Sequence, residues 1–340
     1  MSNSARISRF AAILLAALLP VATAGCGTAS LKPADMTPVS RTAFAFDTVI
    51  RISLYGREET EAGRLLDACM EMADHYDSEV FSAHNEQSAL WKRNHPDEPS
   101  AAKGASDPEL EELIRVGLDW RSRTQGAFSP SLGTLTSLWN FGGDPPGPVP
   151  SPEAIAEALS MTDPKDKDAQ YDLGGIAKGY IADRLKAYLI QNGVTSAVIN
   201  LGGNVLVIGE KPDGSAFRVG IRDPESALSG DTQAEASGQI LRTVEVRGKS
   251  VVTSGIYERT FVEDGVRYHH VLDPATGYPA DTGLLSVTIL SDDSVTGDAL
   301  STACLVLGRE KGQALIESLP DTEALFVTTD GAVTTTSGWH

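Results

Sequence analysis

Hydrophobic and polar residues alternate along much of the second half of the chain, a pattern that predicts strands with one buried face. Residues 259–274 are expected to form a hairpin that turns at Asp264-Gly265, because Asp-Gly is a favoured two-residue turn between alternating segments. Residues 43–56 alternate in the same way and predict one strand near the N-terminus. Further strands are expected at 195–210, where a double glycine turns the chain, and at 217–224, 242–255, 283–292 and 323–338.

Other segments repeat their hydrophobic residues every three to four positions, which predicts amphipathic helices. Residues 107–124 carry Asp107 and Pro108 where a cap and a first-turn proline are typical. Helices are also expected at 84–94, at 174–193 and at 296–320 with a break near Gly308. Another is expected at 58–80, where one face gathers Leu65, Leu66, Cys69, Met72 and Ala73.

Residues 125–150 are rich in glycine, proline and aromatic side chains, and they predict an ordered loop rather than a helix or strand. Clusters of strands interrupted by helices indicate the α+β class, with antiparallel strands and packed helices. The 340 residues are long enough for one large domain.

The N-terminus has the pattern of an export signal. Arg6 and Arg9 precede an apolar run that is too short for an ordinary transmembrane helix. Small residues then lead to Cys26, as in a bacterial lipobox, so we expect residues 1–25 to be a lipoprotein signal peptide and Cys26 to carry the lipid. An ordinary signal peptide followed by an unmodified cysteine is the alternative. Residues 26–42, rich in Ser, Thr, Pro and Ala, predict a flexible tether.

The net charge bears on the class of partner, and the cysteine content bears on disulfide bonding. The formal charge is −18, and removing residues 1–25 takes away two arginines and no acid, which gives −20. A chain this acidic is expected to repel nucleic acid. Cys69 and Cys304 lie far apart in the sequence and predict buried thiols rather than a disulfide.

The first candidate site is the segment 171–183. Gly174 and Gly175 follow Asp172 and open a predicted helix, and Lys178 lies near its start. Free N–H groups at a helix start attract phosphate, and a lysine adds a mobile positive charge. A plain helix start with a surface lysine is the alternative interpretation.

The second candidate site is the segment 296–303. Asp298, Ser301 and Thr302 fall on one face of a predicted helix. A carboxylate and two hydroxyls are hard oxygen ligands that suit Mg²⁺. The alternative is that Asp298 simply caps the start of that helix.

The third candidate site is the segment 268–280, where a predicted strand ends at His270 before a turn that begins at Asp273-Pro274. Histidine carries protons near neutral pH, so His270 is a candidate general base; a structural histidine bonded beneath the turn is the alternative. Asp273 is expected to cap N–H groups of the turn. Together, a hard cation, a phosphate-binding helix start and a proton acceptor suit attack of a hydroxyl on a pyrophosphate.

The segment from His270 to Pro279 also resembles the signature of the ApbE family, the FAD:protein FMN transferases. Seven further blocks resemble that family and occur in its order. They are 45–56, 81–94, 126–142, 171–183, 198–209, 252–259 and 297–303. The resemblance covers about residues 43–338 and implies an ApbE-like domain over residues 43–340. It also implies an enzyme that uses Mg²⁺ to transfer FMN from FAD onto a Ser or Thr hydroxyl of a partner redox protein, with release of AMP.

The resemblance also implies roles for individual residues. Mg²⁺ would be bound by Asp298 and Thr302, with Ser301 nearby and the backbone carbonyl of Gly175. His270 would help to deprotonate the incoming hydroxyl. FAD would be contacted by Phe46, Ala127, Phe128, Ser129, Asp172, Lys178 and Leu272.

Two positions depart from the family pattern: Ser129 stands where Asp is usual, and His84 where Tyr is common. The same resemblance leaves two other functions open, an FAD pyrophosphatase that releases free FMN and AMP, and a flavin-binding lipoprotein without turnover. Partners of such enzymes are typically membrane-bound or exported redox proteins. The sequence therefore predicts a bacterial envelope protein held to a membrane by its lipid anchor alone.

Overall fold

The computed structural model describes residues 36–99, 107–228 and 239–339. Every described residue belongs to one compact unit. The predicted signal peptide and Cys26 lie outside the described residues. None of the described helices is long and apolar enough to cross a bilayer.

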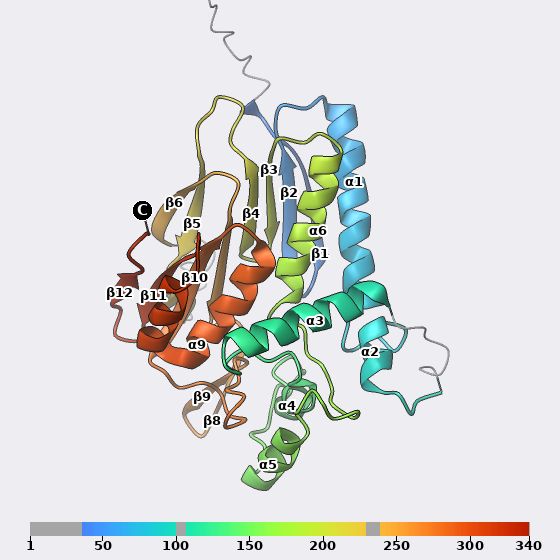
Figure 1. Ribbon diagram of the computed structural model, residues 1–340, viewed down its shortest axis with the longest axis vertical. Helices are drawn as coiled ribbons and strands as arrows, with labels where there is room; N and C mark the ends of the chain where they lie inside the picture. Colours follow the sequence, from blue (N-terminus) through green and yellow to red (C-terminus); the bar gives the residue numbers. More distant parts are fainter. Residues whose placement is uncertain (1–35, 100–106, 229–238, 340) are drawn as a thin grey trace, which may run out of the picture. The chain divides into compact units, whose positions relative to one another are not determined.

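An eight-stranded sheet forms the main layer of the described fold (Figure 1). Its strand order is β1-β2-β3-β4-β7-β10-β11-β12, and each neighbouring pair is antiparallel. The strands are β1 (Val39–Ala45), β2 (Thr48–Leu54), β3 (Ser196–Leu201), β4 (Asn204–Gly209), β7 (Ser250–Gly255), β10 (Leu284–Ser291), β11 (Glu323–Thr328) and β12 (Val333–Thr335).

Two hairpins form separate two-stranded sheets. They are β5 (Phe217–Arg222) with β6 (Ile240–Val246), and β8 (Thr260–Glu263) with β9 (Val266–His269). The β5–β6 pair packs on the main sheet, since Phe217 and Val244 share an apolar cluster with Val207, Val251 and Leu325. The β8–β9 pair carries His269 at its end and leads directly into His270.

Helices cover the other face of the main sheet. Figure 1 shows α1, α6 and α9 side by side across it, and contacts between α6 and α9 and from these helices to the strands agree. This layer holds the main core, whose fully buried members include Ile52, Leu66, Ile181, Leu185, Ile199, Val287, Ile289 and Leu300. The helices are α1 (Glu59–His75), the π-helical turn η2 (Tyr76–Val80), α2 (Ala89–Asn94), α3 (Pro108–Arg123), α4 (Gly133–Trp139), α5 (Pro152–Ser160), α6 (Ala177–Gln191), α7 (Pro224–Leu228) and α9 (Ser294–Glu317).

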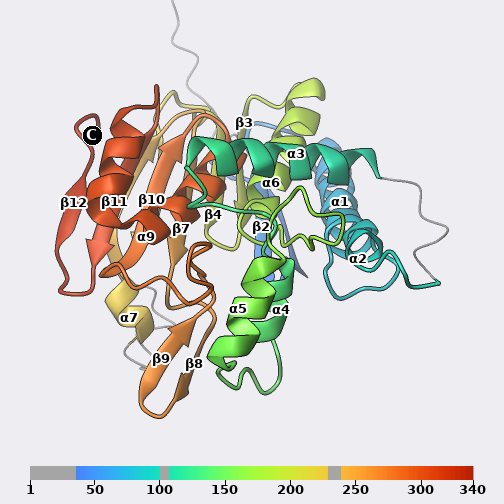
Figure 2. The ribbon, with the colours of Figure 1, turned by 60° about the horizontal axis from the view of Figure 1, so that its bottom comes forward.

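Helices α4 and α5 lie beside the β8–β9 hairpin (Figure 2). Aromatic rings join the two regions: the ring centroids of Trp139 and Tyr268 are 5.6 Å apart, and those of Phe141 and Phe261 are 5.3 Å apart. This contact fixes the base of the hairpin that leads to His270.

Most of the expected elements are confirmed, and with them the α+β class. Asp107 accepts hydrogen bonds from the N–H groups of Glu109 and Leu110 as the cap of α3. The β8–β9 hairpin turns at Asp264-Gly265, and Gly308 interrupts α9 with a φ of 77°. Cys69 and Cys304 are free, buried thiols.

Three expectations about the elements are wrong. Residues 43–56 form a hairpin of β1 and β2 rather than one strand, because Phe46 and Asp47 adopt positive φ values of 55° and 56° without any glycine to signal the turn. The strand β1 begins at Val39, inside the expected tether. Residues 125–150 are not all loop, since α4 forms around Trp139, whose Nε1 donates to the carbonyl oxygen of Gly277 at 2.8 Å.

Candidate active site

The start of α6 and the first turns of α9 touch backbone to backbone. A Cβ added at Gly179 would lie 2.5 Å from the carbonyl oxygen of Ser294 and 2.6 Å from Cα of Val295. Only glycine permits so close an approach. The N–H of Gly179 donates to Oδ2 of Asp298 at 2.9 Å, and Asp298 is only 3% exposed. The buried carboxylate is therefore held against the start of α6.

Asp298 does not cap its own helix, so that alternative is wrong. The helix α9 begins at Ser294 with Asp293 at the cap position, which places Asp298 after the first turn. Its carboxylate instead binds an N–H in the first turn of α6, a helix whose own cap position, Ile176, offers no side-chain hydrogen bond. No described residue donates to Oδ1 of Asp298, so that oxygen is available to a ligand.

Thr302 lies one turn after Asp298 and faces the glycine turn before α6. A Cβ built on Gly175 would lie 3.4 Å from Oγ1 of Thr302 and 3.3 Å from Cε2 of Phe128. Within the described part of the chain, Thr302 Oγ1 makes no hydrogen bond. The structure thus brings together Gly175, Phe128 and Thr302, three residues from separate parts of the sequence.

Ser301 is directed elsewhere. Its hydroxyl is buried, hydrogen-bonds the hydroxyl of Ser254 on β7 at 2.7 Å and donates to the carbonyl oxygen of Asp298 at 3.0 Å. These bonds tie α9 to the sheet. Ser301 therefore supports the helix that carries the predicted metal ligands, and the structure shows no contact between its hydroxyl and Gly175.

The turn before α6 is organised by Asp172. Its N–H donates to the carbonyl oxygen of Pro130 at 2.8 Å, and its Oδ1 accepts the N–H of Gly174 at 2.8 Å. Lys178 is half-buried and donates from Nζ to the carbonyl oxygen of Gly174 at 3.4 Å. Asp172 and Lys178 both lie at the start of α6, as predicted. The side chain of Asp172 shapes the turn by accepting the N–H of Gly174.

The loop 127–129 lies between α3 and the turn that Asp172 organises. Thr124, which follows α3, receives the N–H of Ala127 on its carbonyl oxygen and the N–H of Phe128 on Oγ1 at 3.0 Å. Phe128 is buried with its ring against Gly175. Ser129 is half-buried, and its hydroxyl lies 3.2 Å from that of Ser131.

The two adjacent histidines differ in their surroundings. His269 is buried, and its Nε2 bonds the carbonyl oxygen of Ala280 at 3.0 Å. His270 is half-buried, and its Nδ1 is buried without a partner among the described residues. Burial, and then the charge of Arg259, lower the pKa of His270 to about 3. His270 is therefore a neutral imidazole, able to accept a proton.

The sequence did not single out Arg259, although it belongs to one of the recognised blocks. Its backbone carbonyl accepts the N–H of His270 at 3.1 Å, and its guanidinium binds Oδ2 of Asp47 at 3.1 Å. Phe46, which is partly buried against the core, precedes Asp47 in the β1–β2 turn. Arg259 thus connects His270 to the turn that carries the predicted flavin contact Phe46.

The neighbouring Glu258 was also missed. Its side chain keeps contact with solvent, but the surrounding protein removes enough water to raise the pKa of its carboxyl, and the charges of Lys178 and Arg259 oppose that rise. The Asp298 carboxylate raises it further. Positive and negative groups from α6, α9 and the segment after β7 therefore lie within electrostatic reach of one another.

In the turn after His270, Asp273 caps N–H groups as predicted. Asp273 accepts the N–H of Ala275 on Oδ1 and the N–H of Gly277 on its carbonyl oxygen, each at 2.8 Å. Gly277 has a φ of 77°, and a Cβ there would lie 2.7 Å from Ile155. Leu272 is buried in the cluster around Trp139. It therefore packs beneath the turn, and the structure shows no contact from it to Gly175 or Thr302.

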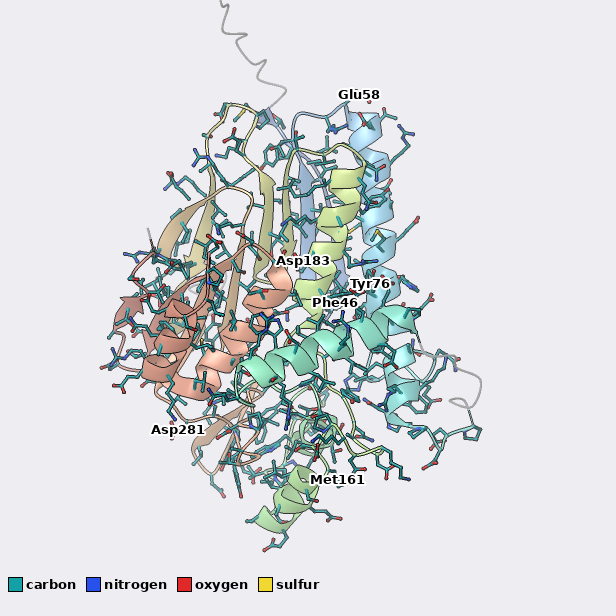
Figure 3. The ribbon with its side chains drawn as sticks, in the orientation of Figure 1. Phe46, Glu58, Tyr76, Met161, Asp183 and Asp281 are labelled. Atoms are coloured by element: carbon teal, nitrogen blue, oxygen red, sulfur yellow. The ribbon has the colours of Figure 1, made fainter. Side chains whose placement is uncertain are left out.

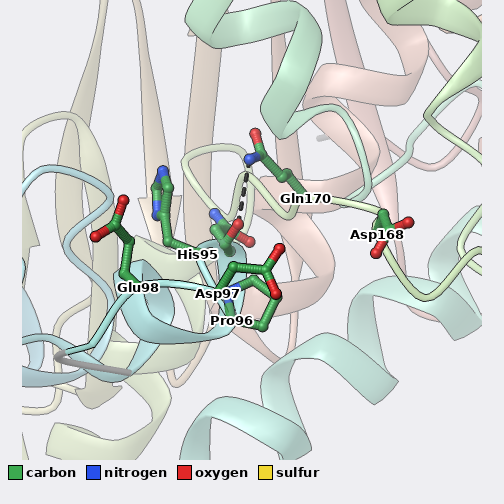
Figure 4. A pocket seen from close by; sticks show the side chains of 7 residues that line it. His95, Pro96, Asp97, Glu98, Asp168 and Gln170 are labelled. Atoms are coloured by element: carbon green, nitrogen blue, oxygen red, sulfur yellow. Dashed lines mark hydrogen bonds between the residues drawn. The ribbon is translucent and has the colours of Figure 1, made fainter. Parts of the chain in front are cut away.

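A shallow hollow of about 270 Å³ lies apart from these residues (Figure 4). Its lining contains none of the predicted site residues, and its floor includes the hydrogen bond from Gln170 Nε2 to the carbonyl oxygen of Asn94, at 3.2 Å. Asn94 also holds Tyr171, the residue before Asp172, through both backbone groups. The hollow therefore lies beside the residues that hold the turn before α6 in place. It is lined by Asn94, His95, Pro96, Asp97, Glu98, Asp168 and Gln170.

The donor set fits a hard cation. Asp298 Oδ1, Thr302 Oγ1 and the backbone at Gly175 offer oxygen atoms and no sulfur or imidazole, which suits Mg²⁺ rather than zinc. No cluster of three or more His, Cys, Asp or Glu side chains suited to a metal occurs among the described residues. That agrees with Mg²⁺, which takes few protein ligands and keeps waters or substrate oxygens.

Comparison with known proteins gives one consistent result. The model of the ApbE family matches residues 46–326. A protein of Treponema pallidum named FAD:protein FMN transferase is 36% identical over 92% of this chain and 91% of its own length. One of Klebsiella pneumoniae with the same name is 34% identical over 86% and 90%.

Solved structures agree with the sequence comparisons. The ApbE protein of Thermotoga maritima superimposes with a TM-score of 0.75, at 33% identity, over 88% of this chain and 97% of its own. The flavinyl transferase ApbE of Pseudomonas stutzeri gives a TM-score of 0.72 at 28% identity, over 88% and 95%. The arrangement of sheet and helices is therefore shared across these proteins.

Proposed function

The chain belongs to the ApbE family, and we propose that it is a Mg²⁺-dependent transferase that moves FMN from FAD onto a Ser or Thr hydroxyl of a partner protein. The observation that carries the metal requirement is the junction of α6 and α9, where Asp298 and Thr302 offer free oxygens, Asp298 against Gly179 and Thr302 against Gly175. Mg²⁺ bound by these residues would draw charge from the pyrophosphate and neutralise the departing phosphate.

The proposed reaction is a phosphoryl transfer in which His270 accepts a proton. The acceptor oxygen forms a bond to the phosphorus of the FMN half, and the bond from that phosphorus to the oxygen of the AMP phosphate breaks. AMP leaves with the bonding electrons, and the product is a phosphoester. The proton of the hydroxyl passes to His270, whose Nδ1 is buried, so Nε2 is the nitrogen that meets the substrate. The imidazole is uncharged in the free protein, so the lone pair of its unprotonated nitrogen is free for this proton.

Other residues bind and orient FAD. Lys178 supplies a positive charge at the start of α6. The N–H groups of Ala177 and Gly179 there already bond Leu173 and Asp298, so the charge of Lys178 is the group that would attract the phosphate. Phe46, Ala127, Phe128 and Ser129 are the proposed flavin or adenine contacts. Phe128 lies against Gly175, which supports its place beside the metal site. Asp172 holds the glycine turn in shape.

The cellular setting is part of the proposal. Cys26 is proposed to carry a lipid that anchors the mature chain to a membrane of the bacterial envelope. The acceptor is proposed to be a membrane-bound or exported redox protein that presents a Ser or Thr to the site. The acidic composition argues against nucleic acid as a partner.

The test is to incubate the purified chain with FAD, Mg²⁺ and a candidate acceptor domain, and to follow AMP release and covalent flavin fluorescence on the acceptor. We expect both signals from the wild type and neither from Asp298→Asn. The asparagine keeps the side-chain volume and one oxygen acceptor but removes the charge that binds the cation. Equal activity of the two proteins at limiting Mg²⁺ would remove the metal site from the proposal.

The same assay separates the two alternative functions. AMP and free FMN without labelled acceptor would indicate an FAD pyrophosphatase. Tight FAD binding without AMP, at saturating Mg²⁺, would indicate a flavin-binding lipoprotein. The neutral imidazole of His270, within electrostatic reach of Lys178 at the start of α6, favours turnover, because storage alone requires no proton acceptor.

A further inference from the structure

Helices α6 and α9 cap one another. Asp298 of α9 accepts the N–H of Gly179 in the first turn of α6 at 2.9 Å. In return, Asp183 of α6 accepts the N–H of Ser294 on Oδ1 and the N–H of Val295 on Oδ2, each at 2.9 Å. Asp183 lies on α6 beside the start of α9 (Figure 3). Each helix thus receives its capping carboxylate from the other.

The exchange meets a need in both helices. The first N–H groups of a helix have no partner within it and are usually satisfied by a side chain at the cap position. Neither cap position serves here: Ile176 has no suitable group, and the side chain of Asp293 makes no capping hydrogen bond. The two interhelical carboxylates therefore replace both local caps.

We infer that Asp183 is a positioning residue for the proposed Mg²⁺ site, because it fixes the start of α9 and with it the placement of Asp298 and Thr302. This inference rests on the proposed function, since it assigns Asp183 a role toward the metal named there. Asp298 lies one helical turn after the two N–H groups that Asp183 holds, and its own carboxylate returns to α6. A shift of α9 against α6 would therefore move Asp298 away from Gly179 and Thr302 away from Gly175.

Asp183 acts together with a second anchor of the same helix start. The hydroxyl of Ser294 binds the side chain of Asn204 on β4, and it accepts a hydrogen bond from the hydroxyl of Ser250 on β7 at 2.9 Å. These bonds fix α9 to the sheet, whereas the Asp183 bonds fix it to α6. Loss of Asp183 should therefore loosen the register of the two helices without releasing α9 from the core.

The charge of Asp183 and its hydrogen bonds could each affect Mg²⁺ binding, and the two effects can be separated by experiment. Negative charge near a helix start is favourable whichever residue carries it. Asp293 carries such a charge at the same helix end and influences Asp183, as does the ammonium of Lys186 from α6. Asp293→Asn removes the same charge as Asp183→Asn but breaks no capping hydrogen bond. It is therefore a matched control.

The experiment titrates Mg²⁺ alone into wild type, D183N, D293N and D298N by calorimetry, and measures AMP release against Mg²⁺ concentration. We expect D183N to weaken Mg²⁺ binding about 10-fold or more, as loss of a residue that orients metal ligands typically does. Because His270 and the FAD contacts are unchanged, the rate at saturating Mg²⁺ should stay near the wild-type value. D293N should bind Mg²⁺ like the wild type.

Each other outcome has a defined meaning. If Mg²⁺ binding is weakened equally in D183N and D293N, the effect is one of charge alone, and the inference is overturned. If D183N melts at a lower temperature but binds Mg²⁺ as the wild type does, Asp183 is merely structural, and the inference is again overturned. If D298N binds Mg²⁺ as the wild type does, the proposed metal site itself fails. Should D183N not fold, Asp183→Glu keeps the charge but displaces the carboxylate by one methylene, and unchanged Mg²⁺ affinity there would equally overturn the inference.

Discussion

The backbone carbonyl of Arg259 accepts the N–H of His270 at 3.1 Å, while the guanidinium of the same arginine lowers the pKa of that histidine. Burial is the larger cause of the lowered pKa, so Arg259 both places the proposed base and adds to the effect of burial in keeping it uncharged. Lys178 adds to the same effect on the pKa. The charge of Lys178, which would attract the pyrophosphate, thus also lowers the pKa of His270, the proposed proton acceptor.

The first prediction concerns the pH dependence of transfer. With a pKa of about 3, His270 of the free enzyme is neutral throughout the range above pH 5, so its protonation should cause no loss of kcat/KM between pH 7 and pH 5. His270→Ala should reduce the transfer rate about 10²- to 10⁴-fold, with little change in FAD affinity. The measurement is transfer rate and FAD affinity across pH. A loss confined to FAD affinity would contradict the role as a base.

His269→Ala is the matched control for that prediction. It removes a buried partner of the Ala280 carbonyl, so it should lower stability by about 1 kcal/mol while the folded enzyme keeps most of its rate. The pKa of each histidine is lowered on folding, so the unfolded chain binds protons more readily and stability is lost as pH falls below about 6.5. Either alanine variant should therefore show a flatter acid side of the stability curve.

The second prediction tests the close approach of α6 and α9. In Gly179→Ala the new Cβ would meet the backbone of Ser294 and Val295 at 2.5–2.7 Å, and backbone cannot move aside as a side chain can. We expect a loss of about 1–3 kcal/mol or more in the free energy of unfolding, measured by urea titration. Gly142→Ala, where nothing lies within 4 Å of the added atom, should change stability far less. Equal stability of the two variants would show that the helices can separate freely.

The sequence predicted elements well where a local signal was present. Asp107, Gly193 and Asp264-Gly265 each end or begin an element as their chemistry requires. The hairpin turn at Phe46-Asp47 could not be found this way, because no glycine marks it and a bulky residue such as Phe rarely adopts a positive φ. The helix α4 was missed because Trp139 is stabilised by a hydrogen bond to Gly277, far along the chain.

The site was predictable to a similar extent. Residue type and family pattern proposed Asp298, Thr302, Lys178 and His270 as site residues, and the structure brings all four to one end of α6 and α9 or within electrostatic reach of it. The reciprocal capping by Asp183 could not be read from the sequence, since Asp183 and Ser294 are 111 residues apart and meet only when the two helices pack together. Arg259 likewise gains its role only through contacts across the fold.

The third prediction concerns the N-terminal cysteine. If Cys26 carries the lipid, the mature wild-type protein should fractionate with membranes, and mass spectrometry should find an acylated N-terminal cysteine. Cys26→Ser should yield an unprocessed or soluble protein without acyl groups, with unchanged transfer of FMN in detergent-free assays of the domain. An unacylated Cys26 in the mature wild type would contradict the anchor.

The fourth prediction isolates the hydroxyl of Thr302. Its Oγ1 faces Gly175 and makes no hydrogen bond to any residue that the structure describes, so its removal leaves no protein group without a partner. Thr302→Val keeps the shape of the side chain and should leave the melting temperature nearly unchanged, whereas Mg²⁺ should bind about 10-fold more weakly because one oxygen ligand is lost. Thr302→Ser keeps the oxygen and should retain most of the affinity. The measurement is calorimetric titration of both variants with Mg²⁺ alone. If the valine variant binds Mg²⁺ as tightly as the serine variant, the hydroxyl faces Gly175 for packing and does not bind the metal.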